Sequence, residues 1–282
     1  MTAAAEPRPP EGFDRDVLAY YEQGKEDGRL RAETHAGSRL EFYRTQDVLR
    51  RVLPAAPARV LDVGGGSGVH AEWLAEDGYA VDLVDPVPLH VEQASRLDGV
   101  TAWVGDARQL DVADAAYDAV LALGPLYHLP ARADRVRVLA EARRAVRPGG
   151  VVAAAAISRY AALHDNLLTG NYFNPDTREM IDSATGDGLL SAKRLFTTAY
   201  LHDPAELEPE FREAGFGEVV VRGLEGAAWL MRDIQEHLDH PERRALVLDA
   251  LRAVETAPSL LGVSGHILAA SVRLTESGPV GG

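Results

Sequence analysis

An acidic residue followed by four closely spaced glycines is the segment of this chain best suited to chemistry. Residues 60–63 form an apolar run that contains Asp62, and four glycines come directly after it: Gly64, Gly65, Gly66 and Gly68. Glycine lets the backbone turn sharply and come into contact with a ligand, because it has no Cβ to obstruct the approach. The apolar run predicts a buried parallel strand, and residues 69–75 predict a helix whose first N–H groups can face a ligand. The segment therefore predicts a nucleotide-binding loop.

Two ligand classes compete for this loop. Residues 66–71 fit the dinucleotide fingerprint G-x-G-x-x-G/A. The acid-first register Asp62-x-Gly64-x-Gly66-x-Gly68 instead resembles motif I of the class I S-adenosylmethionine-dependent methyltransferases. That resemblance implies that Asp62 lies near the amino-acid part of the cofactor and that the glycines surround its sulfonium arm. A carboxylate suits a ligand with an ammonium and a sulfonium group, whereas it would repel a pyrophosphate.

Later motifs follow in the order that is typical of the same family. Asp85 ends the next predicted strand and can accept hydrogen bonds from both ribose hydroxyls of an adenosine, in a dinucleotide as well as in S-adenosylmethionine. The resemblance implies that Asp106, after the third strand, receives the adenine amino group. A helix that ends in Pro148-Gly149-Gly150 before an apolar strand is a further mark of the family. The predicted cofactor-binding residues are Asp62, Gly64, Gly66, Gly68, Asp85, Pro86, Gly105, Asp106, Ala107, Leu123, Gly124 and Tyr21.

His128 is the predicted proton acceptor. It follows the strand predicted at 117–123, at the sheet edge where ligands bind in open α/β folds. An unperturbed imidazole titrates near ~6.5, which suits proton acceptance at neutral pH. The alternative is that His128 lines the site or makes a structural hydrogen bond. Tyr21 is expected to close over the sulfonium, where an aromatic face stabilises a cation, or else to be an ordinary core or surface residue.

The remaining polar candidates are weaker. We expect His70 near the tail of the cofactor, and His164, His202 and His266 in structural roles. Arg29, Glu41 and Arg44 either clamp a polar acceptor or are solvated or capping residues. No metal-ligand spacing such as H-E-x-x-H is present, so nothing requires a metal site, although Asp106, Asp165 and Asp182 leave one open.

Predicted strands and helices alternate along the chain and must position these residues. This alternation predicts an α/β fold with a seven-stranded, doubly wound sheet whose last strand is antiparallel. This is the Rossmann-like fold that the resemblance implies. The predicted organisation is a disordered leader at 1–12, a helical cap at 13–56 and a cofactor-binding core at 57–157. A lid or insertion follows at 158–200, the remainder of the core at 201–275 and a loose tail at 276–282. The arginines between 132 and 147 are expected on the solvated face of an amphipathic helix.

The amino-acid composition limits the classes of binding partner and the location that we expect for this protein. The net charge of −14 disfavours nucleic acid, because a polyanionic backbone would be repelled. The absence of cysteine excludes disulfides, thiol nucleophiles and cysteine-bound iron–sulfur clusters. No apolar run is long enough to span a bilayer and no signal peptide is recognisable, so we expect a cytoplasmic enzyme without a membrane partner. The sequence does not indicate an oligomeric state.

The resemblance implies methyl transfer from S-adenosylmethionine to an oxygen, nitrogen or carbon atom of a small-molecule acceptor, in natural-product biosynthesis or in primary metabolism. The aromatic residues in 158–198 favour a moderately apolar acceptor. The alternative is a protein of the same fold that binds the cofactor without transferring methyl, as a scaffold, a regulator or a catalyst of rearrangements.

Overall fold

The computed structural model describes residues 21, 36–190 and 198–275 of the chain. The leader predicted at 1–12, the tail predicted at 276–282 and, apart from Tyr21, the first helix predicted at 13–23 lie outside the described residues. The predicted acceptor residue Arg29 also lies outside them.

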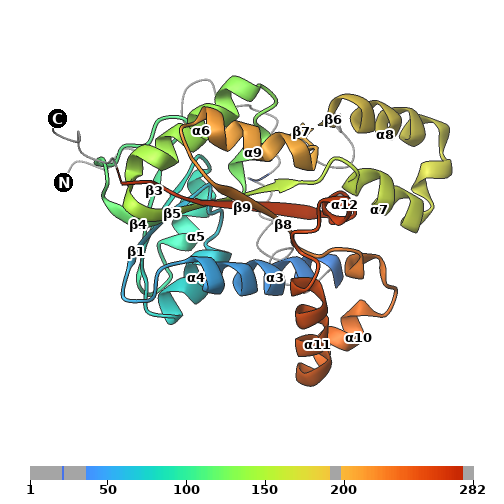
Figure 1. Cartoon of the computed structure of the whole chain (residues 1–282), viewed down its shortest axis with the longest axis horizontal. Coiled ribbons are helices and arrows are strands. Elements are labelled where there is room, and N and C mark those ends of the chain that lie inside the picture. Colours follow the sequence, from blue (N-terminus) through green and yellow to red (C-terminus); the bar gives the residue numbers. More distant parts are fainter. Residues whose placement is uncertain (1–20, 22–35, 191–197, 276–282) are drawn as a thin grey trace, which may run out of the picture.

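A seven-stranded sheet in the order β3-β2-β1-β4-β5-β9-β8 forms the centre of the molecule (Figure 1). β1 to β5 pair in parallel, and β9 pairs antiparallel with both β5 and β8. This confirms the predicted doubly wound sheet with an antiparallel last strand. The strands are β1 (Arg59–Val63), β2 (Ala80–Asp85), β3 (Val100–Val104), β4 (Tyr117–Ala122), β5 (Val146–Ile157), β8 (Val219–Gly223) and β9 (His266–Val272).

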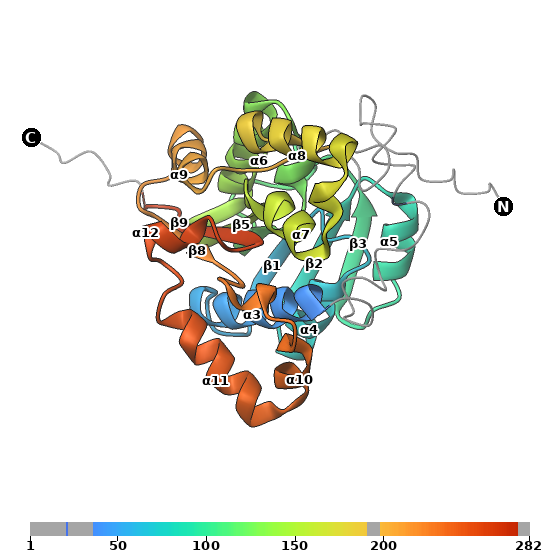
Figure 2. The same cartoon turned by 90° about the vertical axis from the view of Figure 1, so that its right-hand side faces the viewer.

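Helices cover both faces of this sheet (Figures 1 and 2). α3 (Ala36–Val52), α4 (Val69–Glu76) and α5 (Pro88–Ala94) pack on one face, where Leu49 and Leu74 are fully buried. α6 (Arg132–Ala145) and α9 (Pro204–Glu213) pack on the other, where Leu139 and Phe211 are fully buried. Strands covered on both sides must be apolar along their whole length, which explains why β4 and β5 lack an alternating pattern.

Two details differ from the sequence prediction. β5 begins at Val146, and Pro148-Gly149-Gly150 lies inside it as an irregularity, after which regular pairing with β4 resumes at Val151. Arg135 is not on a solvated face: it is buried, donates hydrogen bonds to Glu210 of α9 and stacks over Tyr200. An arginine on the α6 face that meets α9 can be buried because an ionised partner satisfies its guanidinium.

The segment predicted as a lid or insertion contains α7 (Ala161–Thr169), η2 (Asn171–Phe173) and α8 (Pro175–Asp187). The short strands β6 (Leu189–Leu190) and β7 (Ala199–Tyr200) at the end of this segment pair antiparallel. Its apolar residues form a separate small cluster that includes Ile181, Ala184 and Leu201. In both views these helices stand beside the carboxyl ends of the central strands (Figures 1 and 2).

The C-terminal part returns to the sheet. α9 begins with a capping box that Asp203 and Glu206 form around Pro204. Between β8 and β9 the chain forms four short helices: η3 (Ala228–Leu230), α10 (Ile234–Asp239), α11 (Pro241–Arg252) and α12 (Pro258–Leu261). No helix in the described ranges has the length and apolarity needed to cross a membrane.

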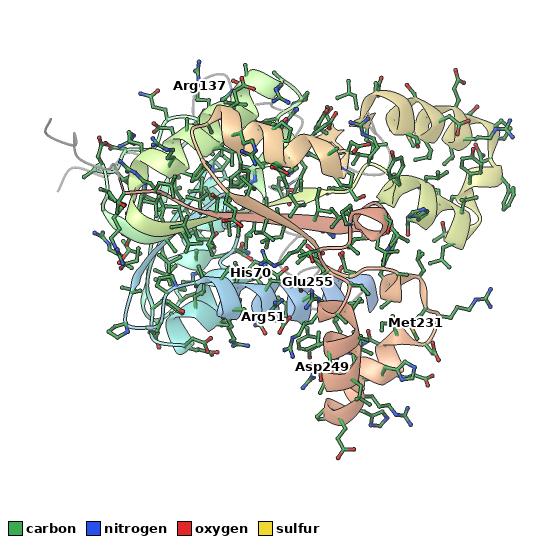
Figure 3. All side chains as sticks on the ribbon, viewed as in Figure 1. Arg51, His70, Arg137, Met231, Asp249 and Glu255 are labelled. Carbon is green, nitrogen blue, oxygen red and sulfur yellow. The ribbon has the colours of Figure 1, made fainter. Side chains whose placement is uncertain are left out.

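A buried ion-pair network fastens α3 to the C-terminal helices (Figure 3). The guanidinium of Arg44 is fully buried and donates hydrogen bonds to the carboxylates of Asp47 and Glu255 and to the carbonyl of Leu224. Arg51 donates to the same Glu255 carboxylate. Arg44 is therefore neither an acceptor clamp nor a solvated residue, and it fixes the helix that forms one wall of the pocket.

Replacing Arg44 with Met should lower the free energy of unfolding by up to about 3–5 kcal/mol, because it removes the one fully buried cation of the network and leaves the more exposed arginines to neutralise Asp47 and Glu255. Urea denaturation at pH 7 measures this change. Arg50→Met is the matched control, since Arg50 pairs with Asp77 at the surface of the molecule. The control should cost about 1 kcal/mol or less, and equal losses in the two variants would contradict the role given to the network.

Candidate functional site

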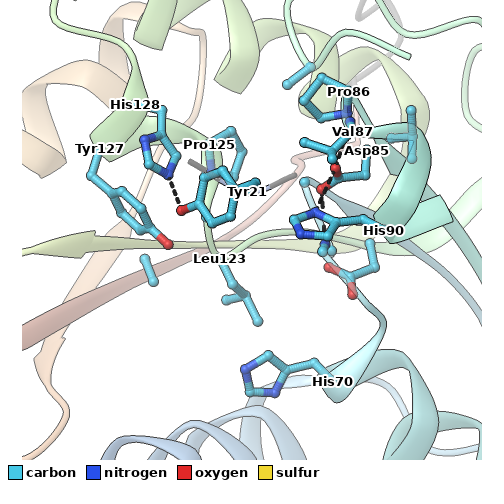
Figure 4. Close-up of a pocket in the computed structure, with 18 of the residues that line it drawn as sticks. Tyr21, His70, Asp85, Pro86, Val87, His90, Leu123, Pro125, Tyr127 and His128 are labelled. Carbon is cyan, nitrogen blue, oxygen red and sulfur yellow. Dashed lines mark hydrogen bonds and ion pairs between the residues drawn. The ribbon is translucent and has the colours of Figure 1, made fainter. Parts of the chain in front are cut away.

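A pocket that is partly open to solvent lies at the carboxyl ends of β1, β2 and β4 (Figure 4). This is the edge at which ligands bind in open α/β sheets. Most of the residues predicted from the sequence line it: Tyr21, Asp62, Gly64, Gly66, Asp85, Pro86, Gly105, Asp106, Ala107, Leu123, Gly124 and His128. Glu41, one of the candidates for an acceptor clamp, lines it too, as do residues that sequence reasoning did not place here, including Thr45, Gly65, His90 and Leu224.

The glycine loop has the shape that its composition predicts. Gly64 and Gly66 have φ values of +67° and +59°, a region that favours glycine. Gly65, which the motif spacing does not mark, is the most restricted: a Cβ there would lie 2.5 Å from Oδ2 of Asp62 and 2.6 Å from Leu83. Gly68 does not line the pocket. It is the N-cap residue of α4, and a Cβ there would lie 2.6 Å from Leu97 and 3.3 Å from Ala94.

Asp62 is buried at the end of β1 without a cationic partner. Its Oδ2 atom accepts no hydrogen bond from any described residue, although buried polar atoms nearly always have a partner. Burial, together with the negative charge of Asp85, raises the pKa of Asp62 to about 7. A ligand that carries positive charge into the pocket would offset both effects.

Asp85 is held in place by the protein. One carboxylate oxygen, Oδ2, accepts a hydrogen bond from the backbone N–H of Gly66 at 3.0 Å. The other, Oδ1, accepts from the N–H of Val87 at 2.9 Å and lies 3.1 Å from Nδ1 of His90 (Figure 4). The side chain thus links β2 to the glycine loop, and His90 on α5 is a site residue that the sequence analysis missed.

Asp106 is paired with a residue that the sequence analysis did not single out. Arg108 donates to its carboxylate from the backbone N–H at 2.8 Å and from the guanidinium at 2.7–3.1 Å. Burial alone would raise the pKa of Asp106, but the hydrogen bonds from Arg108 lower it below its usual value. Asp106 is therefore ionised at neutral pH, and any adenine amino group would share it with Arg108.

Tyr21 and His128 lie together on the other side of the pocket. The Tyr21 hydroxyl is 2.6 Å from Nε2 of His128, and the ring of Tyr21 also packs edge-on against His90 (Figure 4). Tyr21 is the one described residue of the N-terminal 35, and only 8% of it is exposed. The structure thus joins two residues that were predicted for different roles.

His70 points into the pocket from α4 (Figure 4). Its Nδ1 accepts a hydrogen bond from the indole N–H of Trp73 at 3.2 Å. Because indole can only donate, the proton of the neutral imidazole must be on Nε2. Burial lowers the pKa of His70 to about 4, so the ring is a neutral hydrogen-bond donor at pH 7.

The other histidines are distributed as follows. His202 is fully buried beside Glu210, and His164 packs near Trp229, in agreement with structural roles. His266 lies against Glu225 and Glu41, and these three side chains are the one set of three histidine or carboxylate groups in the described part of the chain whose ligand atoms all lie within 4.8 Å of one another. Glu41 lines the pocket from α3.

Comparisons with known proteins agree with this geometry. Residues 60–150 match the family model described as a methyltransferase domain. The ubiquinone biosynthesis O-methyltransferase of Xylella fastidiosa is 31% identical over 193 residues, which cover 66% of this chain and 72% of that protein. The 27-O-demethylrifamycin SV methyltransferase of Amycolatopsis mediterranei is 34% identical over 121 residues, 39% of this chain and 43% of that protein.

Two further matches are more limited: one covers a smaller part of the related protein, and the other, to a solved structure, shows only that the fold is shared. An uncharacterized methyltransferase of Mycobacterium tuberculosis is 40% identical over 101 residues, so the match spans 35% of this chain and 40% of the relative. A solved S-adenosylmethionine-dependent methyltransferase of Methanosarcina mazei superposes with a TM-score of 0.54 at 19% identity, over 81% of this chain and 98% of that one.

Asp62→Asn should make the ligand-free protein more stable at pH 8 but not at pH 4. The folded-state pKa of about 7 lies above the unfolded value of 3.8, so the wild-type protein loses stability as the pH rises between these values. A shift of about three units corresponds to a change on the order of 4 kcal/mol, which the neutral amide avoids. Urea denaturation of both proteins at pH 4, 6 and 8 measures it, and a difference that does not change with pH would contradict the raised pKa.

Proposed function

The chain belongs to the class I S-adenosylmethionine-dependent methyltransferases, and we propose that it transfers a methyl group from this cofactor to an oxygen atom of a small molecule. The observation that carries the proposal is the buried, unpaired carboxylate of Asp62 beside a glycine loop. Such a carboxylate is costly in the ligand-free protein and suits a cofactor with an ammonium and a sulfonium group.

The residues present fit that cofactor. Asp62 would hold the ammonium group, and the neutral Nε2–H of His70 would donate to the carboxylate of the same amino-acid part. Asp85 would accept from the ribose, and Asp106 with Ala107 would hold the adenine. The glycine loop leaves the space that any Cβ at Gly65 would fill. When bound, the cofactor supplies an electrophilic methyl group on its sulfonium.

The protein's own contribution is alignment and exclusion of water. A displacement at carbon needs the acceptor atom in line with the reacting bond, and such positioning can contribute roughly 7–11 kcal/mol. Leu123, Leu129, Ala155 and Leu224 give the pocket an apolar wall that would exclude water and position an apolar acceptor. Tyr21 would cover the sulfonium with its ring, held there by its contact with His128.

The names of the relatives support an oxygen atom as the acceptor. Two of them are named as O-methyltransferases or for an O-demethylated substrate, one in quinone biosynthesis and one acting on a rifamycin. We propose a hydroxyl-bearing, largely apolar natural product as the acceptor. Cytoplasmic residence and the absence of a nucleic-acid partner stay predictions from composition.

The geometry adds one condition to the sequence prediction that His128 is the proton acceptor. Its Nε2 is engaged with the Tyr21 hydroxyl. Proton acceptance at this atom requires that Tyr21 moves away or passes the proton on through its own hydroxyl. Anchoring of Tyr21 needs neither step, so we propose anchoring as the main role of His128.

Isothermal titration calorimetry at pH 8 should detect binding of S-adenosylmethionine and S-adenosylhomocysteine, and no binding of NAD. Asp62→Asn should weaken S-adenosylmethionine binding about 10- to 100-fold, since a hydrogen bond to a charged group contributes roughly 1.5–3 kcal/mol. Asp249→Asn is the control, because Asp249 lies on α11, away from the pocket (Figure 3). Binding of NAD, or unchanged affinity in Asp62→Asn, would reject this cofactor assignment. A screen of hydroxyl-bearing acceptors with labelled cofactor then tests transfer itself.

Tyr21→Phe and His128→Ala distinguish anchoring from proton acceptance. If His128 anchors Tyr21, both variants should weaken cofactor binding by a similar factor of about 5–12, the equivalent of one hydrogen bond of roughly 1–1.5 kcal/mol. If His128 is the base, His128→Ala should bind the cofactor normally and lose turnover mainly at pH 7 rather than at pH 9. Calorimetry and the pH profile of turnover separate the two outcomes.

A further inference from the structure

His90 is a buried pocket residue to which the proposed function gives no role. It lies on α5, five residues after Asp85, and only 4% of it is exposed. It lines the pocket together with Asp85, Pro86 and Val87. The few polar side chains of a ligand pocket usually fix the orientation of the ligand. We therefore ask which ligand group the imidazole of His90 can reach.

Asp85 fixes one side of the His90 ring. Nδ1 of His90 lies 3.1 Å from Oδ1 of Asp85. Asp85 contributes a negative charge to the raised pKa of Asp62, so its carboxylate is ionised. An ionised carboxylate can only accept a hydrogen bond, so Nδ1 carries a proton and donates it. The second ring nitrogen, Nε2, is therefore the atom that is left for a ligand.

Nε2 of His90 borders the pocket. It has no hydrogen-bond partner among the described residues, and it is not one of the buried polar atoms that lack a partner, so it is accessible. The ring points from α5 into the pocket, beside Tyr21 (Figure 4). The rings of Tyr21 and His90 meet edge-on with their centroids 5.3 Å apart, which restricts rotation of the imidazole.

The position of His90 places it on the cofactor side of the pocket. α5 follows β2, whereas the apolar residues Leu123 and Leu129 follow β4, and β1 lies between these two strands in the sheet. The His90 ring also lies over the glycine loop, since a Cβ at Gly66 would be 4.0 Å from its Nδ1. Its hydrogen-bond partner Asp85 is the residue expected to bind the ribose. His90 therefore borders the place where the ribose would lie.

The carboxylate of Asp85 has room for fewer hydrogen bonds than a ribose offers. A carboxylate has about four lone-pair sites. Oδ1 already accepts from the N–H of Val87 and from His90, and Oδ2 accepts from the N–H of Gly66. About one site, on Oδ2, is left. Asp85 can thus bind one ribose hydroxyl rather than both, and the second hydroxyl needs another partner.

We propose that Asp85 and His90 bind the ribose of S-adenosylmethionine together, with one hydroxyl on Oδ2 of Asp85 and the other on Nε2 of His90. A hydroxyl both donates and accepts, so it can pair with Nε2 whether the imidazole is neutral or protonated. The proposal rests on the cofactor of the proposed function but not on methyl transfer. It makes His90 a specificity residue for the sugar, because a deoxyribose would leave a buried polar atom without a partner.

A purely supporting role for His90 gives a different expectation. If Asp85 binds both hydroxyls and His90 only holds Asp85 in place, removing the imidazole disturbs the recognition of both hydroxyls or of neither. If Nε2 binds one hydroxyl itself, removing the imidazole abolishes the recognition of that hydroxyl and preserves the other. Ligands that lack one hydroxyl at a time therefore separate the two roles.

Isothermal titration calorimetry at pH 8 with S-adenosylhomocysteine and its 2′-deoxy and 3′-deoxy analogues tests the proposal without turnover. The wild-type protein should bind both analogues more weakly, by about 10- to 100-fold where the Asp85 carboxylate loses its hydroxyl and about 3- to 10-fold where His90 does. His90→Leu should bind S-adenosylhomocysteine about 3- to 10-fold more weakly. It should then show no further loss, within about twofold, for one analogue and keep the loss for the other.

Two further variants make the measurement specific. His90→Gln keeps a polar group that can reach a hydroxyl, so it should retain part of the discrimination that His90→Leu loses. His237→Leu is the matched control, because this histidine lies on α10 and its side chain pairs with Asp233. The control should bind all three ligands as the wild-type protein does. The discrimination that persists in His90→Leu also shows that this variant is folded.

The other outcomes contradict the proposal in distinguishable ways. Discrimination that persists against both analogues in His90→Leu, or that falls for both, would reduce His90 to a support for Asp85. Wild-type binding of either analogue that equals the binding of S-adenosylhomocysteine would also overturn the proposal. A wild-type protein that does not bind S-adenosylhomocysteine would overturn the cofactor assignment as well. One that binds it but methylates no acceptor would overturn only the proposed methyl transfer.

Discussion

The burial of the Asp62 carboxylate, together with the nearby charge of Asp85, is the constraint on which the site depends. Parallel pairing of β1 and β2 brings the ends of both strands to the same edge, where both carboxylates are buried. Asp85 is stabilised by the N–H groups of Gly66 and Val87, whereas Asp62 has no described partner and its pKa rises to about 7. Gly65 allows this approach, because any larger residue would displace the Asp62 carboxylate. The glycine loop thus surrounds a carboxylate whose charge no described cation neutralises. This is the property expected of a binding site for a positively charged sulfonium cofactor.

The wall opposite this loop is supplied by α3, and its position follows from a second set of buried charges. Arg44 and Glu255 are removed from water together, and each satisfies the other. The same helix presents Glu41 and Thr45, which lie one turn apart, to the pocket, while Arg44 between them is buried. Because a helix is rigid over this length, anchoring one residue orients the other two. The sequence shows three polar residues close together among apolar ones. It does not show which of them is anchored in the interior and which face the pocket.

The sheet and most of the cofactor side could be predicted because they depend on local patterns. Apolar runs and the acid–glycine spacing are each encoded within about ten residues, and the structure has the expected doubly wound sheet. What could not be predicted depends on contacts between distant segments. Arg135 looks like a surface residue of α6 until α9 supplies Glu210. His266 was expected to be structural because it lies in an apolar strand, and its partner Glu225 lies 41 residues away in the sequence.

The antiparallel strand explains why a residue at the start of β9 reaches the same edge as residues at the ends of the parallel strands. Ligands bind in open α/β sheets outside the carboxyl ends of the parallel strands. β9 runs in the opposite direction, so its first residue, His266, pairs with Ile157 at the end of β5. The chain can therefore place side chains at this edge from both strand ends and strand beginnings. In this protein the strand ends supply the carboxylates of the pocket, and the reversed strand places the imidazole of His266 beside Glu41, a residue of α3 that lines the pocket. An all-parallel sheet would have turned that residue toward the opposite edge.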